Sequence, residues 1–412
     1  MSDKNNKALK LGWRRVKFGD VVRLSKARSQ DPLADGIERY VGLEHLEPGD
    51  LRIRSWGNVA DGVTFTSVFQ PGQVLFGKRR AYQRKIAVAD FSGVCSGDIY
   101  VLETKDAQVL LPELLPFICQ TDAFFDHAVG TSAGSLSPRT NWKSLAEFEF
   151  SLPPIEKQAE LVAVLSSAIS VSDSDSLAVE ASWSLLRSLL IATFETGADP
   201  LRRATHKKWP CQPLSCFISV KHGWAFKGDF FSEDSSSGPQ LLIPGNFTEF
   251  GWFDFSSERN KHYTGEFPED YRLCQGDLLL LMTDLTPSAK LLGAPGMVES
   301  SSTLLHNQRL GKVVVNEFIG PSEEIFKEYL HFFFMSEVFR RQVRAQAAGS
   351  TVSHSSPTQI CRIALPCPSD DEIESVLLPL RSARDALLTL KSRVSGAVRL
   401  ASALRQAHLE GG

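Results

Sequence analysis

Residues 373–404, IESVLLPLRSARDALLTLKSRVSGAVRLASAL, decide the fold. Counted in heptads from the first isoleucine, every a and d position is apolar. The a positions are Ile373, Leu380, Leu387, Val394 and Ala401, and the d positions are Val376, Ala383, Leu390, Ala397 and Leu404. A sustained a/d pattern is typical of a helix that packs along another helix. We predict a helical rod of about 40 residues, roughly 60 Å long. Pro379 should kink this rod or mark its true first turn.

A second stretch of the same kind begins at Ile155 and spans about 40 residues. Its seam is apolar at both ends and weak over residues 170–176, where serine and aspartate are poor helix formers. That tract leaves a continuous helix and a short break both open. The a positions are Ile155, Val162, Ile169, Ser176, Trp183 and Leu190, and the d positions are Gln158, Leu165, Ser172, Val179, Leu186 and Thr193. The patterns predict two rods that pack together; two unrelated amphipathic surface helices are the alternative.

Each rod closes a copy of one sequence plan, which runs over residues 13–195 and again over 209–408. A tryptophan opens each copy, and apolar residues follow it at matching spacings. PGQVLF at 71–76 has its counterpart in CQGDLL at 274–279. The offsets between counterparts run from about 196 to 219 residues, the scale of a domain rather than of a short repeat. A duplicated domain with a rod after each copy predicts a protein that touches two places at a fixed distance.

Composition places the 412-residue chain among soluble globular proteins of two to three domains, with 42% apolar and 23% charged residues. No apolar run approaches the roughly 18 residues of a membrane span, and the first residues lack the apolar core of a secretory signal. The seven cysteines are scattered without a C-x-x-C pair, which argues against disulfides and structural zinc. We expect a cytoplasmic protein with reduced thiols and no membrane contact. The net charge of −3 requires any basic surface to be local.

Short strand-type runs separated by turns fill the first copy, at 40–43, 62–65, 73–76, 86–89 and 99–102. The second copy has such runs near 241–247, 277–282 and 310–315. One helix is expected at 112–128 and its counterpart near 322–347, because each carries an apolar stripe. Strands and helices in separate blocks indicate an α+β domain.

Several stretches, taken in order, resemble the specificity subunits of type I restriction–modification systems. GWAFK at 223–227 and LIPGNF at 242–247 resemble the start of a recognition domain in that family. QGDLLL at 275–280 and LHNQRL at 305–310 resemble its core strands, and LPPIEKQ at 152–158 resembles the opening of its conserved helix. The resemblance covers nearly the whole chain. CPSDDE at 367–372 departs from the family's usual proline–glutamate–glutamine opening.

The resemblance implies an α+β fold with two duplicated target-recognition domains, separated by an antiparallel, pseudo-two-fold pair of long, coiled-coil-like helices. The implied segments are a first recognition domain at 1–150, a first spacer helix at 151–198, a second recognition domain at 205–366 and a second spacer helix at 367–408. The chain would then be the non-catalytic subunit that reads a bipartite, asymmetric site in double-stranded DNA, as part of phage defence. The two half-sites would lie on successive major-groove faces, and rod length would set the unread spacer.

The same resemblance implies partners that carry the chemistry. Two modification (methyltransferase) subunits would use S-adenosylmethionine to methylate adenine N6. Two restriction (motor–nuclease) subunits would translocate and cut DNA with ATP and Mg²⁺. This chain itself would then hold no cofactor and no metal.

The densest basic cluster is KRRAYQRK at 78–85, with five cations in eight residues between two strand-type runs. Cations neutralise phosphates, and arginine or amide forks read base edges. The candidate DNA contacts here are Lys78, Arg79, Arg80, Tyr82, Gln83, Arg84 and Lys85. A solvated turn is the alternative for this segment. The second copy has no such cluster, which predicts that the two domains read different sequences.

Two small, polar loops are the next candidates, GTSAGSLSPRTN at 130–141 and GSTVSHSSPT at 349–358. Their amides and hydroxyls suit phosphates, whereas simple linkers are the alternative. The first loop gives Thr131, Ser132, Ser135, Arg139 and Asn141, and the second gives Ser350, Thr351, Ser353 and His354. Further candidates in the second copy are Lys221, His222, Lys227, Thr283, Thr286, Ser288 and Lys290. Trp224 is equally compatible with a core position.

Three catalytic interpretations are weak. Residues 72–79 nearly spell a phosphate-binding loop, but their centre is strand-like and Arg79 replaces the required hydroxyl. Asp98, Glu103 and Lys105 lie on one strand-type run with no further acid nearby for a metal site. Pro153-Pro154 lacks the flanking residues by which an adenine methyltransferase grips its target amine. We therefore expect a binding protein. A restriction–methylation enzyme with its own active site and a scaffold that binds only protein partners are the alternatives.

Overall fold

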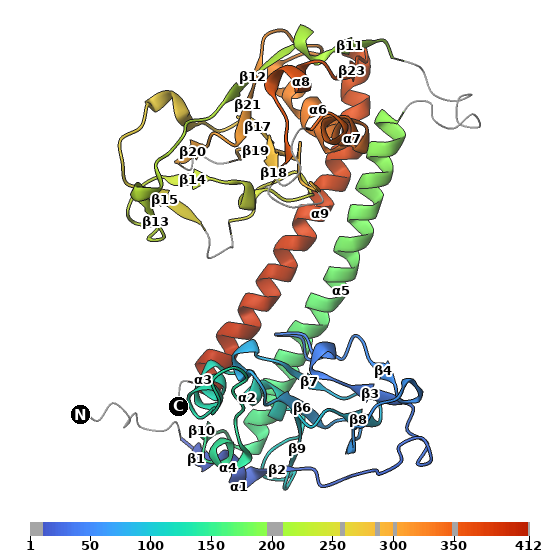
Figure 1. The fold of residues 1–412 in the computed structure, drawn as a ribbon, viewed down its shortest axis with the longest axis vertical. Helices are drawn as coiled ribbons and strands as arrows, with labels where there is room; N and C mark the ends of the chain where they lie inside the picture. Colours follow the sequence, from blue (N-terminus) through green and yellow to red (C-terminus); the bar gives the residue numbers. More distant parts are fainter. Residues whose placement is uncertain are drawn as a thin grey trace. The chain divides into compact units, whose positions relative to one another are not determined.

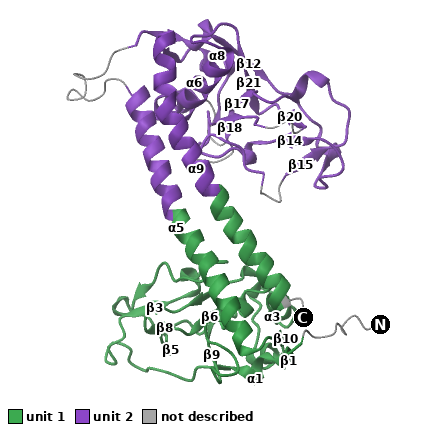
Figure 2. Cartoon of the chain, turned by 180° about the vertical axis from the view of Figure 1, so that it is seen from behind, with its two compact units in different colours: residues 1–176, 392–412 green, residues 177–391 purple. Residues whose placement is uncertain are grey.

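The computed structural model describes residues 11–195, 209–255, 260–284, 289–299, 303–347 and 353–410. The chain forms two compact units (Figure 2). Unit 1 comprises residues 1–176 and 392–412, and unit 2 comprises residues 177–391. Two long helices, α5 (Ile155–Phe194) and α9 (Asp370–Arg405), each contribute one part to unit 1 and the other part to unit 2 (Figure 1).

The globular part of unit 1 is built from short strands followed by short helices. Its strands are β1 (Arg14–Lys17), β2 (Val22–Leu24), β3 (Arg39–Val41), β4 (Gly57–Asn58), β5 (Ser67–Phe69), β6 (Val74–Gly77), β7 (Ile86–Val88), β8 (Gly93–Cys95), β9 (Ile99–Thr104) and β10 (Glu149–Leu152). Its short helices are α1 (Phe18–Val21), α2 (Leu115–Cys119), α3 (Asp122–Gly130) and α4 (Trp142–Ala146). One sheet has the order β2-β9-β6-β7, a second has the order β4-β3-β8-β5, and β1 pairs with β10.

Unit 2 repeats this plan. Its strands are β11 (Cys211–Pro213), β12 (Ile218–His222), β13 (Phe231–Ser232), β14 (Gln240–Leu242), β15 (Lys261–Tyr263), β16 (Arg272–Leu273), β17 (Leu278–Leu281), β18 (Thr283–Asp284), β19 (Pro295–Met297), β20 (Leu304–His306), β21 (Leu310–Val315), β22 (Ser353–His354) and β23 (Ala364–Pro366). Its short helices are α6 (Glu323–Met335), α7 (Glu337–Ala345) and α8 (Pro357–Cys361). The sheets have the orders β12-β21-β17-β19 and β13-β15-β14-β20-β16, and β11 pairs with β23.

The strand pairings confirm the duplication. The first sheet of each unit is antiparallel throughout and has the same order of counterparts. In the second sheet each unit has one parallel pair, β3 with β8 and β14 with β20, flanked by antiparallel strands. The register between the copies differs by one residue from the sequence pairing of 71–76 with 274–279. Gly72 and Gly276, both in the left-handed region, occupy the same turn position, donating to Ala89 and Val298 respectively.

The paired rods predicted from the heptads are present, and they run antiparallel. In unit 1, Leu165 at the start of α5 belongs to the same core as Ala401 near the end of α9. In unit 2, Leu186 toward the end of α5 belongs to the same core as Leu380 near the start of α9. α5 is continuous through residues 170–176, so the Ser/Asp tract does not break it. Pro379 lies inside α9 rather than at its first turn.

Gln158 is a polar residue at a d position of the heptads, and it is buried. It connects the start of α5 to the domain before it. Its Nε2 donates to the carbonyls of Val109 and Pro153, each at 2.9 Å, and its Oε1 accepts from the Leu111 amide at 2.9 Å. A buried amide needs such partners, because an unpaired polar group in the core is costly. The "LPP…Q" opening is therefore a structural joint between the rod and unit 1.

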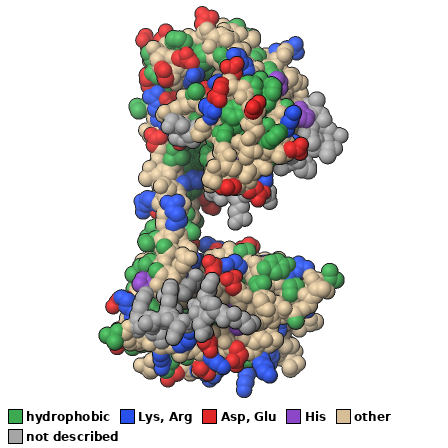
Figure 3. All heavy atoms as spheres, turned by 90° about the vertical axis from the view of Figure 1, so that its left-hand side faces the viewer, with side chains coloured by type: hydrophobic (Ala, Val, Ile, Leu, Met, Phe, Trp, Pro, Cys, Tyr) green, Lys and Arg blue, Asp and Glu red, His purple; other side chains and the backbone are tan. Residues whose placement is uncertain are grey.

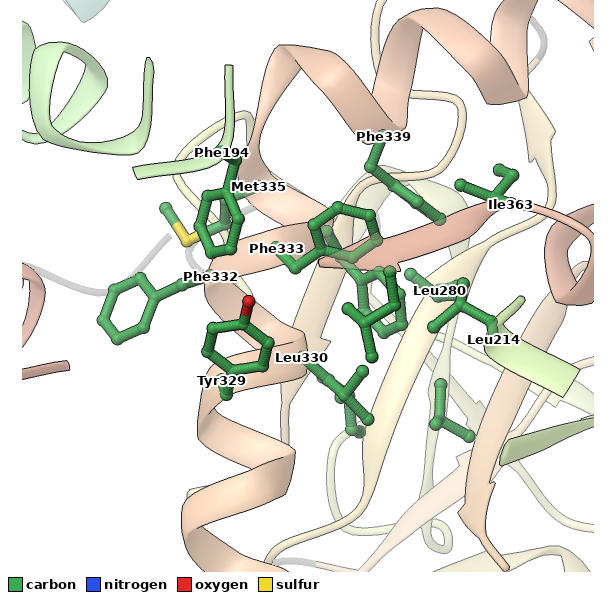
Figure 4. Close-up of a cluster of buried hydrophobic side chains, with 14 of the residues drawn as sticks. Phe194, Leu214, Leu280, Tyr329, Leu330, Phe332, Phe333, Met335, Phe339 and Ile363 are labelled. Carbon is green, nitrogen blue, oxygen red and sulfur yellow. The ribbon is translucent and has the colours of Figure 1, made fainter. Parts of the chain in front are cut away.

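The core of unit 2 is rich in aromatic side chains and receives the end of α5 (Figure 4). Phe194 packs on Tyr329 and Phe333 at ring-centroid distances of 5.6 and 5.5 Å. The single helices expected at 112–128 and 322–347 are each broken into two. Thr121 and Ser336 cause the breaks, since each hydroxyl donates to the helix before it and caps the helix after it. The expected strand at 62–65 is also wrong; the strand in this region is β5.

By length and composition alone, α5 is apolar enough to cross a membrane, which is weak evidence because core helices of soluble proteins share these properties. Its middle carries Asp173 and Asp175, both engaged in ion pairs. Asp173 pairs with Arg52 at 2.6 Å, and Asp175 pairs with Arg393 of α9 at 3.0 Å. A membrane-spanning position would remove the aqueous surroundings of these charges at a large cost. The ion pairs favour the paired rods predicted from the heptads.

Candidate nucleic-acid interface

In unit 1 the two segments that the sequence marked as DNA contacts lie against each other. The basic segment 78–85 connects β6 to β7, and the loop 130–141 follows α3. Arg79 and Arg139 form an antiparallel β-bridge. The Arg80 amide donates to the Pro138 carbonyl at 2.7 Å, and the Thr140 amide donates to the Lys78 carbonyl at 3.0 Å. The fold therefore combines both candidates into one surface.

A carboxylate beneath this surface holds the two segments in place. Asp98 accepts from Arg139 Nε at 2.7 Å, and Arg79 Nη1 lies 3.4 Å from its other oxygen. The hydrogen bond from Arg139 is the main cause of a lowered Asp98 pKa, with the Arg79 interaction adding to it and burial opposing it. The Asp98 of the discarded nuclease pattern thus has a structural role. Glu103 likewise pairs with Arg23 at 2.7 Å, and Lys105 Nζ donates to the Gly19 carbonyl.

Three further cations of the basic segment are engaged with the fold. Lys78 lies over the Tyr100 ring at 4.5 Å, and burial lowers its pKa. Arg84 pairs with Asp122 and stacks on Phe125 at 4.6 Å. Lys85 Nζ donates to the Leu43 carbonyl at 2.7 Å. A DNA phosphate would have to compete with these contacts. Most cations in this segment are therefore less available for binding DNA than their number suggests.

Arg80, Tyr82 and Gln83 remain as the available members of the segment. No ion pair or side-chain hydrogen bond of Arg80 is recorded within the described part of the chain, and its Nε is buried without a partner. Tyr82 is 56% exposed. Arg80 and Arg84 adopt φ values of 54° and 55° on either side of the turn that holds Tyr82, a conformation uncommon for residues other than glycine. Such strain concentrates at functional sites.

The loop 130–141 uses several of its polar side chains internally. Thr131 and Ser132 donate back to the carbonyls of His127 and Ala128 at 2.8 and 2.7 Å. Asn141 caps α4 by accepting from the Ser144 amide at 2.9 Å. Ser135 is exposed, and beside it Leu136 is 89% exposed. Sequence reasoning missed Leu136, whose signal is an isolated apolar residue in a small, polar loop and whose side chain suits a thymine methyl group.

Unit 2 has the same pairing with different side chains. Residues after β17 form β18, which pairs with β22 so that Thr283 lies opposite His354 and Asp284 opposite Ser353. The Ser355 amide donates to the Met282 carbonyl at 3.0 Å, as Thr140 does to Lys78 in unit 1. Thr283 is buried, and its Oγ1 lies 2.9 Å from His354 Nδ1. The duplicated fold therefore brings Thr283, Ser353 and His354 together.

The other candidates of unit 2 are more dispersed. Lys221 and His222 are exposed at the end of β12, and Lys227 is exposed in the segment that follows. Trp224 is 40% exposed and packs on Tyr271 at 5.3 Å. Lys290 pairs with Glu249 at 2.8 Å. Thr286, Ser288, Ser350 and Thr351 lie outside the described residues.

Charge on the molecular surface is mixed in sign. On the face drawn in Figure 3, lysine and arginine side chains are interspersed with acidic ones. Within the described ranges, no group of three or more His, Cys, Asp or Glu side chains could hold a metal ion. The side chains of the paired loops described above can offer hydrogen-bond donors and positive charge to an extended anionic ligand.

The fold and the candidate site describe a duplicated α+β protein with paired loops in each copy and two long antiparallel helices. The sequence is 31% identical over 160 residues to the EcoDI type I restriction enzyme specificity subunit of Escherichia coli, a match over 36% of this chain and 33% of that subunit. It is 21% identical over 406 residues to the MjaVIII specificity subunit of Methanocaldococcus jannaschii, covering 92% of this chain and 88% of that subunit. The chain is thus similar in sequence to two type I specificity subunits, and it spans about a third of the first and most of the second.

Solved structures show the same fold. The S subunit of a type I restriction–modification system from M. genitalium has a TM-score of 0.61 at 12% identity, with 97% of each chain covered. A chain from a structural study of type I restriction–modification complex assembly has a TM-score of 0.51 at 16% identity, covering 97% of this chain and 98% of that one. No model of a known protein family matches the sequence.

Proposed function

We propose that this chain is the DNA-recognition subunit of a type I restriction–modification complex and that each unit reads one half of a bipartite target. The observation that carries the proposal is the repeated loop pairing, Lys78 with Thr140 in unit 1 and Met282 with Ser355 in unit 2. It presents polar side chains from two segments at the same topological position in both copies. Because those side chains differ between the units, the two half-sites should differ in sequence.

The proposed division of labour within each unit follows from which side chains are engaged. In unit 1, Arg80 and Gln83 are the proposed base readers, since they are not held by the fold in the way that Arg79 and Arg84 are. Arg79 and Arg139 are the proposed positioning residues, with Asp98 beneath them. In unit 2, His354 and Ser353 take the corresponding position beside Thr283.

The partners belong to the proposal as well. Modification subunits would bring S-adenosylmethionine to adenine N6, and restriction subunits would bring the ATP- and Mg²⁺-dependent motor and nuclease, all in the cytoplasm. In this proposal the continuous helices α5 and α9 set the interval between the half-sites. The 40 residues of α5 correspond to roughly 60 Å of helix.

The test is to co-express the chain with its modification subunits in a host free of other type I systems and to map methylated adenines by sequencing. We expect one bipartite, asymmetric motif. Arg80→Ala combined with Gln83→Ala should relax one half of that motif and leave the other half and the spacer unchanged. Arg309→Ala, an exposed arginine in the β20–β21 turn of unit 2, serves as the matched control.

The outcomes separate the alternatives. A motif that stays the same in the double variant would contradict the assignment of readers in unit 1. Absence of any motif, together with no gel shift of duplex DNA in the presence of the partner subunits, would favour a scaffold that binds only proteins. Methylation by the chain purified alone would indicate an active site of its own.

A further inference from the structure

Unit 2 contains a pocket of about 380 Å³, to whose lining the segment after β18 contributes Lys290. It lies among the end of α5, the start of α7 and the segments that carry Glu249 and Lys290. The volume falls in the range of roughly 300–1,000 Å³ that is usual for small-molecule sites. Trp183, Leu190, Ile191 and Met335 form an apolar wall, and charged side chains form the rest of the lining.

The charged lining has an excess of cations. Four basic side chains, Arg187, Lys290, Arg340 and Arg344, stand against two carboxylates. Both carboxylates are already used, Glu249 by Lys290 at 2.8 Å and Glu337 by Arg344 at 2.6 Å. Arg187 is exposed and forms no recorded ion pair with any described residue. Among the lining residues, Arg187 and Arg340 therefore have no recorded ion pair in the described part of the chain, although Glu337, Glu249 and Asp284 act on Arg340 electrostatically.

Arg340 makes this imbalance costly. Its side chain is only 5% exposed, and of its five N–H donors one recorded hydrogen bond goes to the Lys290 carbonyl. Its Nε is buried without a partner among the described residues. A buried guanidinium needs a counter-charge or several hydrogen bonds. The fold thus holds a cation in the lining of the pocket that a bound anion would satisfy.

The start of α7 adds to the attraction. Ser336 caps this nine-residue helix and lines the pocket together with Glu337. The first turn of a helix carries a partial positive charge, which favours a bound phosphate, although in α7 Ser336 already accepts from the Phe339 amide. The start of α7 and the buried Arg340, which lies on the same helix, favour the same kind of ligand.

We propose that this pocket binds a phosphate group, carried by a small ester whose apolar or aromatic part lies against Trp183. The excess of two positive charges matches a phosphate dianion, and the arginines offer the forked geometry that phosphate oxygens accept. The phosphate could also be supplied by a DNA backbone, and the experiment distinguishes these two sources. The proposal does not depend on the DNA-recognition function.

The experiment is isothermal titration calorimetry of the full chain with inorganic phosphate, adenosine 5′-monophosphate and adenosine as probes. We expect the two phosphate-bearing probes to bind with one-to-one stoichiometry and adenosine not to bind. Arg187→Ala should weaken binding about tenfold or more, the usual value of a hydrogen bond to a charged group. Arg341→Ala is the matched control, since this arginine is also on α7 but pairs with Glu195 and is not part of the pocket lining.

Arg340→Met provides the second variant and should abolish binding while circular dichroism reports on its folding. Because Arg187 is exposed, its alanine variant keeps the test decisive even if the Arg340 variant does not fold. Displacement of adenosine 5′-monophosphate by a short DNA duplex would assign the phosphate to DNA, and persistence of binding would assign it to a small molecule. No saturable binding of either phosphate probe at millimolar concentration, or equal binding by the wild type and Arg187→Ala, would overturn the proposal.

Discussion

The loop after the short 3-10 helix contacts α5 in both units, but with opposite chemistry. In unit 1 this loop follows residues 43–45, and it reaches α5 through Arg52 and Arg54, whose guanidinium nitrogens lie 2.6 and 3.1 Å from Asp173. In unit 2 it follows residues 244–246, and Phe250 packs edge-on against Trp183 of α5 at 4.7 Å. The same joint between the globular domain and the helix is thus ionic in one copy and aromatic in the other.

Helix α9 follows the same division. In unit 1, Arg393 of α9 pairs with Asp175 of α5 at 3.0 Å. In unit 2, Lys391 of α9 lies over the stacked rings of Phe250 and Trp252, at 4.4 and 4.7 Å. Salt screens exposed ion pairs, whereas apolar contacts are not weakened by screening. The duplicated units thus keep the joint at the same position but differ in its chemistry, so they should respond differently to pH, truncation and salt.

The largest difference should appear on acidification. Burial lowers the pKa of His306 to about 4 and that of His331 to about 3, and both histidines lie in unit 2. An unfolded histidine takes up its proton near pH 6.5, so the unfolded state binds more protons below that pH. The two histidines therefore leave the stability of unit 2 unchanged above about pH 6.5 and lower it progressively as the pH falls to about 3–4. At pH 5 the expected loss is about 2 kcal/mol for each histidine.

Hydrogen exchange followed by mass spectrometry at pH 7 and pH 5, corrected for the intrinsic exchange rate, measures this loss separately in peptides of each unit. His331→Phe removes one of the two titrations within an aromatic core and should cut the pH effect in unit 2 by about half. Equal protection of unit 2 at the two pH values would contradict the prediction.

Truncation of the aromatic joint should give the next largest effect. Trp183→Ala removes a half-buried indole and its contact with Phe250, and we expect unit 2 to lose about 2 kcal/mol of stability against opening. Peptides covering residues 243–255 should exchange faster, while those of unit 1 stay unchanged. Leu185→Ala, on the same helix and 55% exposed, is the control and should have little effect. A loss no larger than that of the control would show that the aromatic contact does not stabilise the joint.

Heptad periodicity predicted the rods and their pairing, because both depend on apolar residues repeated at a fixed spacing, and the recurrence of similar motifs in the same order predicted the duplication. It could not predict the breaks at Thr121 and Ser336, because the apolar stripe continues across both caps. The polar and basic composition of the segments identified both loops of the candidate interface without indicating that they pair. The role of Asp98 was equally hidden, since its partners Arg79 and Arg139 lie 19 and 41 residues away along the chain. Such long-range polar contacts have no periodic signal.

The paired loops offer a smaller contrast between the units. Asp98 holds the unit 1 pair with charge-assisted hydrogen bonds, whereas in the described part of the unit 2 pair Thr283 contacts His354. Asp98→Asn keeps the shape but removes the charge. We expect a local loss of about 1 kcal/mol, since Arg139 is half exposed and its ion pair is screened by solvent. Faster proteolysis within residues 130–141, with residues 353–358 unaffected, is the measurement. An unchanged rate of cleavage in the first loop would mean that Asp98 does not hold the pair.

The smallest effect should come from the ionic joint of unit 1, and its dependence on salt is the sharpest test of the comparison. Arg52 is 53% exposed in its pair with Asp173, so Asp173→Ala should cost below about 1 kcal/mol at low salt. Near 1 M salt the Debye length falls to about 3 Å, and the difference between variant and wild type should vanish.

A double-mutant cycle with Arg52→Ala isolates the pair from other consequences of each change. Ser174→Ala controls for altered helix propensity, and Trp183→Ala should keep its effect at both salt concentrations. If the coupling between Arg52 and Asp173 persisted at high salt, the joint of unit 1 would be held by packing, as in unit 2, and the contrast between the two copies would disappear.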